Sequence, residues 1–210
     1  VNQGKLTWKT TIAQIFPELV GTMHPSYESV TIAQLMQHRS GIAGMDGEQL
    51  NRAWSTQGTM LEKRYEFVSW VLSTAPAATP GTTVIYSNAG TTTAAAMLER
   101  IEGKDWETMN RENLCAPLGL KSVGLGVPGD LNAASPDQPW GHKLEDGSKL
   151  VPNSGDNPPV IGPAALLHIS ADDFARWLIV HVEGHNGGFA NYMSKENWKS
   201  LHIAPPGSNP

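Results

Sequence analysis

The chain has 210 residues, enough for the core of one domain, and its 40% hydrophobic content is typical of a globular protein. A formal net charge of -5 without a Lys/Arg cluster argues against nucleic acid or an anionic membrane surface as a partner. No stretch approaches the roughly 18 consecutive apolar residues that a membrane-spanning helix needs. We therefore expect a single domain over residues 1–210 that binds neither nucleic acid nor a membrane.

Two short helices are predicted near the start of the chain. Thr11 can cap a helix that runs through Phe16, and Thr31 can cap a second one with an apolar stripe. Ser40 and the glycine after it should close that second helix. We expect His38 in its last turn, where positive charge complements the helix dipole, so that His38 and Ser40 have a structural role at a helix end.

The next segment contains a helix, a turn and a longer helix. Apolar side chains recur at helical spacing over residues 60–72, with charged residues around them. A Pro-Gly turn leads into the β-branched and aromatic run 82–86, which favours extended backbone. A helix is then predicted from about Asn88 to Glu102, with Gly103 as its left-handed stop. Tyr86 and Asn88 should project into a cleft at this helix N-terminus, while Ser87 points away.

The rest of the chain divides into two regions. Seven of the 15 prolines fall between Pro128 and Pro163, which marks a long irregular region after the helical region 1–125. Residues 126–163 either wall a cleft or form a solvated connection with one or two short hairpins. Capping serines then predict helices within residues 164–203. The chain should be mainly α with short β elements.

Metal and cysteine chemistry are not expected. His181 and His185 are four residues apart, but Gly184 should end the helix before His185 can share a face with His181, and the spacing matches no zinc motif. The single cysteine, Cys115, excludes an internal disulfide and is interpreted as a small buried residue.

A succession of motifs resembles one family. Tyr86-Ser87-Asn88, preceded by PGT and followed by AG and a helix of small residues, resembles the Y-x-N element of class C serine β-lactamases, penicillin-binding proteins and related esterases. Six further segments follow the order of that family: KLTWKTTIAQIFPEL, VTIAQLMQHRSGI, CAPLGLKSVGLG, PWGH, DNPP and IGPAALLHISADDFARWL. The resemblance covers nearly the whole chain. It implies the helical part of a β-lactamase/transpeptidase-like α+β fold that lacks most of the antiparallel sheet.

The resemblance also implies roles for two residues. In the family a serine attacks an acyl carbon, and a tyrosine and a lysine move its proton. Tyr86 would be the base or proton shuttle, which needs nearby positive charge because a phenol has a reference pKa of about 10. Asn88 would orient the substrate or the lysine through its donor and acceptor groups. No cofactor is implied, the substrate would be a small acyl compound, and the location would be the bacterial periplasm or cytoplasm.

Two family elements are missing from the sequence. Neither S-x-x-K nor K-T-G occurs, and His-Asn-Gly at residues 185–187 is expected to be a helix-terminating loop. We therefore expect a chain truncated at both ends and inactive alone, from a hydrolase of β-lactam amides or small esters. The alternative is a non-catalytic binding or interaction module on the same fold. Helices without their sheet should expose an apolar face, which predicts a homodimer.

Overall fold

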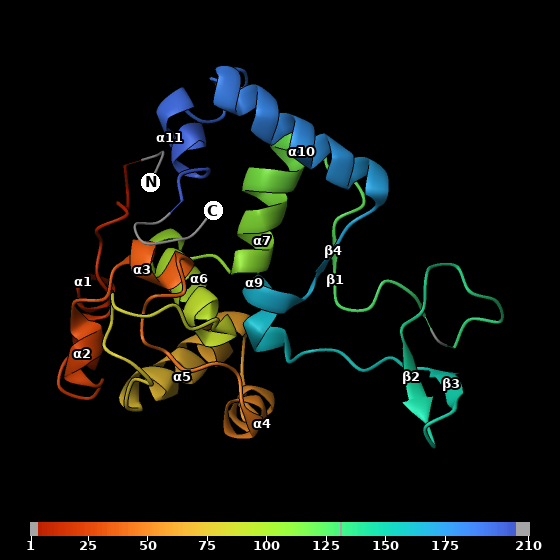
Figure 1. The fold of residues 1–210 in the computed structure, drawn as a ribbon, viewed down its shortest axis with the longest axis horizontal. Coiled ribbons are helices and arrows are strands. Elements are labelled where there is room, and N and C mark those ends of the chain that lie inside the picture. Colours follow the sequence, from red (N-terminus) through yellow and green to blue (C-terminus); the bar gives the residue numbers. More distant parts are fainter. Residues whose placement is uncertain (1–3, 131, 205–210) are drawn as a thin grey trace.

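The computed structural model describes residues 4–130 and 132–204, which are mainly helical (Figure 1). The first half contains α1 (Ile12–Ile15), the 3-10 turn η1 (Pro17–Leu19), α2 (Pro25–Glu28), α3 (Ile32–Met36), α4 (Gly47–Ser55), α5 (Met60–Ser73) and α6 (Asn88–Glu102). The second half contains α7 (Trp106–Asn110), the π-helical turn η2 (Arg111–Cys115), α8 (Ala116–Leu118), the 3-10 turn η3 (Pro159–Ile161), α9 (Gly162–Ala165), α10 (Ala171–Asn186) and α11 (Lys195–Ser200).

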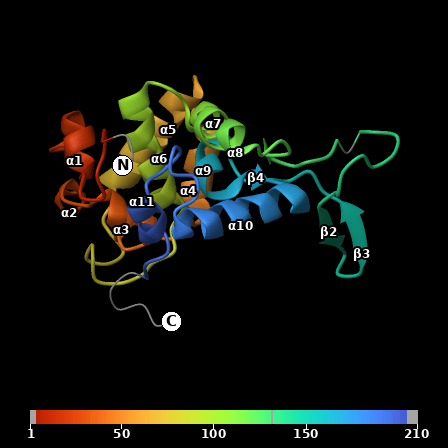
Figure 2. The same cartoon turned by 90° about the horizontal axis from the view of Figure 1, so that it is seen from above.

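Short strands form two separate antiparallel pairs. β1 (Gly124–Leu125) pairs with β4 (Leu167–His168), and β2 (His142–Glu145) pairs with β3 (Lys149–Pro152). The β2–β3 hairpin stands away from the helices in both views (Figures 1 and 2). Its opposed Leu144 and Leu150 are exposed. The described residues are thus mainly α with short β elements, as the sequence predicted, and the irregular region contains one hairpin.

Local capping explains where several helices begin. Thr11 and Thr31 each form a capping box, in which the backbone N–H of the threonine donates to the side chain of Gln14 or Gln34 at 2.9 Å. α6 begins at Asn88 and ends at Glu102, and Gly103 adopts a left-handed φ of 65°. The predicted limits of this helix are confirmed.

The core is divided into two clusters of buried side chains. The larger cluster surrounds α5 and α6, with Phe67, Val68 and Met97 at its centre. The smaller one lies between η2–α8 and the pair α10–α11, where Trp198 is 1% exposed. No helix of the described residues is long and apolar enough to cross a bilayer.

A buried ion network ties the first core to the later helices. The fully buried Arg64 of α5 contacts Glu99 of α6 and donates to Glu107 of α7 at 2.5 Å, and its Nε donates to the Val160 carbonyl at 3.0 Å. Glu99 also accepts from the Trp106 N–H at 2.8 Å. The sequence pattern placed Arg64 among the charged residues around the helix. Its burial follows because these partners satisfy its guanidinium in the interior.

Two expected helix ends are wrong. α3 ends at Met36 and His38 has a φ of 55°, so His38 lies beyond the helix in a left-handed conformation. Gly184 lies inside α10, which continues to Asn186 and ends at Gly187. A Cβ at Gly184 would lie 2.4 Å from the Trp198 ring, so this glycine permits a close helix contact and does not end the helix.

The run 82–86 does not form a strand. Thr82 lies in a turn, and the backbone is irregular until Ser87, which is extended with φ -142° and ψ 112°. The run 82–86 is therefore a loop, and its Ile85 N–H donates to the His38 carbonyl in another loop.

We predict that Arg64→Met lowers the free energy of unfolding by about 3–5 kcal/mol, because it leaves Glu99 and Glu107 in the interior without their cation. Urea unfolding measures this change. Lys104→Met is the matched control: Lys104 pairs with Glu112 at 2.7 Å on the surface, and its loss should cost at most about 1 kcal/mol. Equal losses in the two variants would contradict the structural role of Arg64.

We also propose that the chain forms a homodimer through α10, whose large apolar side chains Phe174, Leu178, Ile179 and Val182 are half exposed or more. A specific interface would bury about 800 Å² per chain. Light scattering after size exclusion should show a dimer that Leu178→Lys dissociates, while Val20→Lys on another surface leaves it intact. A monomeric unmodified chain would overturn the proposal.

Candidate active site

A loop of four residues holds the segment that carries Tyr86. Three backbone N–H groups of that segment donate to carbonyls of residues 38–41: Ala77 to Gly41 at 2.9 Å, Gly81 to Arg39 at 2.7 Å and Ile85 to His38 at 2.8 Å. These bonds link two irregular segments that form no strand with each other. They satisfy backbone groups that have no helix or strand to join.

The path of this loop depends on two left-handed residues. His38 has φ 55° and Gly41 has φ 78°. A Cβ at Gly41 would lie 2.3 Å from the Ala78 carbonyl oxygen, so only glycine fits between the two segments. Ser40 between them is 1% exposed, and its Oγ accepts from the Ile42 N–H at 3.3 Å. Ser40 therefore has a structural role, but in this loop and not at the end of α3, where the sequence placed it.

Ser87 is fixed by three hydrogen bonds. Its N–H donates to His38 Nδ1 at 3.2 Å, its Oγ donates to the Ala43 carbonyl at 2.8 Å, and the same Oγ accepts from the Gly90 N–H at 3.0 Å. Ser87 is thus the N-cap of α6 and is completely buried. Its side chain points into the protein, as predicted, and its hydroxyl is not available for attack on a substrate.

Tyr86 and Asn88 lie on either side of this fixed serine. Tyr86 is 66% exposed, and its ring contacts the His38 ring with centroids 4.8 Å apart. Asn88 is the first residue of α6 and is partly buried. Within residues 4–130 and 132–204, neither the Tyr86 hydroxyl nor the Asn88 side-chain amide has a hydrogen-bond partner. Two polar groups with no internal partner are therefore presented beside a helix N-terminus.

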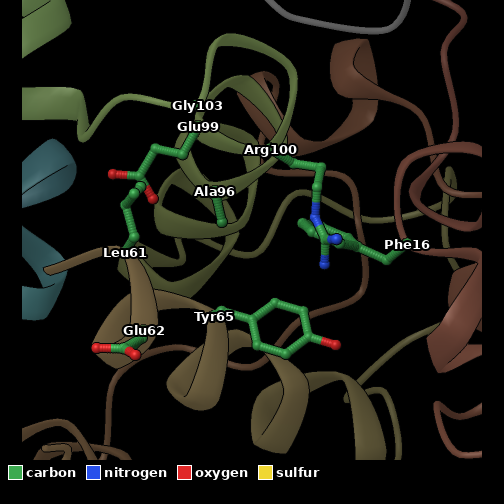
Figure 3. A pocket seen from close by; sticks show the side chains of 8 residues that line it. All are labelled: Phe16, Leu61, Glu62, Tyr65, Ala96, Glu99, Arg100 and Gly103. Carbon is green, nitrogen blue, oxygen red and sulfur yellow. The ribbon is translucent and has the colours of Figure 1, made fainter. Parts of the chain in front are cut away.

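A pocket of about 310 Å³ lies at the other end of α6 (Figure 3). Arg100 of α6 and Tyr65 of α5 face each other across it, with Phe16 beside them. Burial raises the pKa of Glu99, which also lines it, to about 7, although Arg64 acts in the opposite direction. Because α6 rises about 1.5 Å per residue, this pocket lies roughly 20 Å from Tyr86 and does not belong to the same site.

In the part of the chain that the structure describes, the other nucleophilic and metal-binding side chains are not gathered into a second centre. Cys115 is buried, and desolvation raises the pKa of its thiol. The ring nitrogens of His181 and His202 are 3.2 Å apart, and burial followed by repulsion from His202 lowers the pKa of His181. His185 shares α10 with His181, contrary to the expectation from Gly184. Even so, no three metal-ligating side chains of the described residues are grouped to hold a metal ion.

Comparison with known proteins places the chain in a family. The family model described as Beta-lactamase matches residues 1–202. The chain belongs to the β-lactamase family. Among curated relatives, this β-lactamase-family chain is 24% identical over 176 residues to an unguisins hydrolase of Aspergillus violaceofuscus, with 81% of the chain and 30% of the relative covered. It is 24% identical over 196 residues to penicillin-binding protein 4 of Amycolatopsis lactamdurans, with 87% and 46% covered.

Solved structures show that the family fold extends over nearly the whole chain. A D-stereospecific amidohydrolase from Streptomyces matches with a TM-score of 0.71 and 18% identity, covering 98% of this chain and 60% of that one. A class C β-lactamase matches with a TM-score of 0.63 and 21% identity, covering 86% and 45%. These two likenesses show the fold alone. The β-lactamase-family chain described here spans less than half the length of the two curated relatives.

Sequence reasoning missed the part that His38 plays in this site. It assigned His38 to the last turn of a helix, whereas the structure brings its Nδ1 and ring against the Y-x-N triplet and its carbonyl against Ile85 just before it. The only local signal was the His-Arg-Ser-Gly order just after a predicted helix, which fits a helix end equally well.

Proposed function

We propose that this chain provides the Tyr-Asn part of the active site of a β-lactamase-family hydrolase. Tyr86 would move the proton of an attacking serine, and Asn88 would orient the substrate carbonyl or the lysine. The observation that carries the proposal is that Tyr86 and Asn88 present polar groups without internal partners, while Ser87 between them is held in place.

The proposed reaction is acyl transfer through a serine acyl-enzyme. Tyr86, as phenolate, would accept the proton of the serine hydroxyl as the serine oxygen attacks the acyl carbon. It would then return the proton to the leaving nitrogen or oxygen, and a water would hydrolyse the ester so formed. A phenolate needs a neighbouring cation, which a lysine would supply.

Residues 1–210 contain no S-x-x-K motif that could supply this serine and lysine. Ser40 and Ser87, the serines nearest to the site, are buried and engaged in hydrogen bonds. The serine and lysine are therefore part of the proposal and not of the described chain. The alternative, a non-catalytic binding module that uses Tyr86 and Asn88, is favoured by the same missing motif.

The proposed substrates are β-lactam amides or small esters. The names of two similar proteins, a penicillin-binding protein and a D-stereospecific amidohydrolase, favour an amide. The acidic net charge of the chain offers no attraction for a polyanionic substrate, which agrees with a small acyl compound.

Tyr86→Phe should lower kcat by about 100- to 10,000-fold while KM changes only a few-fold, because the phenol oxygen acts mainly in the transition state. The measurement uses the protein expressed from its complete reading frame, with a chromogenic cephalosporin and a nitrophenyl ester as substrates. Tyr65→Phe is the matched control, since Tyr65 donates its hydroxyl to Glu18 at 3.0 Å near the other end of α6. Unchanged turnover in folded Tyr86→Phe would remove Tyr86 from the catalytic residues.

Residues 1–210 alone should form no covalent acyl adduct, because a proton shuttle without an attacking serine has nothing to activate. Intact mass spectrometry after incubation with a penicillin or an activated ester measures this. A stoichiometric adduct on one serine would show that the chain carries an attacking group of its own.

A further inference from the structure

We propose that His38 is a positioning residue that sets the orientation of Tyr86, a role that rests on the catalytic function proposed above. Three contacts support it. The His38 carbonyl accepts from the Ile85 N–H at 2.8 Å, its Nδ1 accepts from the Ser87 N–H at 3.2 Å, and its ring lies against the Tyr86 ring at 4.8 Å. One residue therefore holds the backbone immediately before and immediately after Tyr86, and its ring also contacts the Tyr86 ring.

The backbone of His38 indicates that the side chain is needed. Its φ of 55° is a left-handed conformation that costs energy for most residues other than glycine. Glycine or asparagine would be the residues expected at such a position. The imidazole of His38 supplies two things that glycine cannot: an acceptor for the Ser87 N–H and a surface against which the Tyr86 ring packs.

The hydrogen bond from Ser87 also fixes which nitrogen of the neutral His38 ring carries the proton. A backbone N–H can donate to Nδ1 only if Nδ1 carries a lone pair, so the proton of the neutral imidazole must be on Nε2. Because Ser87 is at the same time the N-cap of α6, His38 Nδ1 links the Tyr86 backbone to the start of that helix. Tyr86 is 66% exposed, so the surrounding protein offers its side chain little other support.

A measurement of the His38 tautomer tests the hydrogen bond between Ser87 and His38 and needs no enzymatic activity. Two-bond ¹H–¹⁵N correlation spectra of residues 1–210, with the His38 signals assigned from their loss in His38→Asn, should show the proton of His38 on Nε2 and an acceptor at Nδ1. A His38 with its proton on Nδ1 would overturn the proposal, whatever Tyr86 does in catalysis.

Two substitutions separate the side chain from the backbone. His38→Gly keeps the left-handed backbone and removes the ring, while His38→Asn tolerates the same backbone and offers a side-chain oxygen near the position of Nδ1. In the protein from the complete reading frame, His38→Gly should lower kcat by about 10- to 100-fold with KM changed less than about threefold, since small misplacements of a catalytic group have effects of this size. His38→Asn should restore most of the loss.

Val71→Ala is the control for general destabilisation, because Val71 of α5 is buried in the larger core cluster and belongs neither to the loop at residues 38–41 nor to the triplet. It should lower the thermal midpoint and leave kcat near the unmodified value. A His38→Gly variant whose kcat matches that of Val71→Ala would overturn the positioning role. If Tyr86→Phe also leaves kcat unchanged, the proposed function fails by itself, and the tautomer result still decides whether His38 holds the triplet as described.

Discussion

The structure of the candidate site depends on the backbone hydrogen bonds between residues 38–41 and residues 77–85. Neither segment belongs to a helix or strand, so each would leave backbone groups without partners if the other moved away. The pairing requires a glycine at position 41 because the Ala78 carbonyl approaches it too closely for any side chain. Because of this pairing, Ser87 has the extended backbone conformation that the N-cap of α6 needs. The exposed position of Tyr86 and the partly buried position of Asn88 then follow from the bonds that hold their buried neighbour.

The far end of α6 is held by a different kind of interaction. There Arg64 joins Glu99 and Glu107 in the interior, and two carboxylates share one guanidinium. Desolvation by burial raises the pKa of Glu99 to about 7, and the charge of Glu107 acts in the same direction, whereas Arg64 acts against it. This network connects α5, α6, α7 and η3, so α6 is fixed at its C-terminal end by ions and at its N-terminal end by the Ser87 cap. A rigid helix between these two points can present the Y-x-N triplet without a strand beneath it.

The sequence predicted those features that depend on neighbouring residues. The limits of α6, the helix caps at Thr11 and Thr31 and the inward side chain of Ser87 follow from local hydrogen bonds and periodicity, and the family follows from the order of motifs along the chain. Features set by distant contacts could not be predicted. His38 is left-handed because its ring and carbonyl meet residues 85–87, Gly184 stays within α10 because Trp198 packs on it, and Arg64 is buried because three later elements surround it. The roles of Tyr86 and Asn88 remain predictions that enzymatic measurements must test.

Residue-resolved amide hydrogen exchange of the unmodified chain tests the central claim most directly. If the loop at residues 38–41 holds the triplet, the amides of Gly81, Ile85 and Ser87 should be protected to nearly the same degree as Ala95 in the middle of α6. Gly126 donates to the Leu166 carbonyl at 2.8 Å directly beside the β1–β4 pair and provides an internal comparison. Exchange of Gly81, Ile85 and Ser87 at the rates of an unstructured peptide, while Ala95 stays protected, would show that α6 forms without the pairing and would contradict the account.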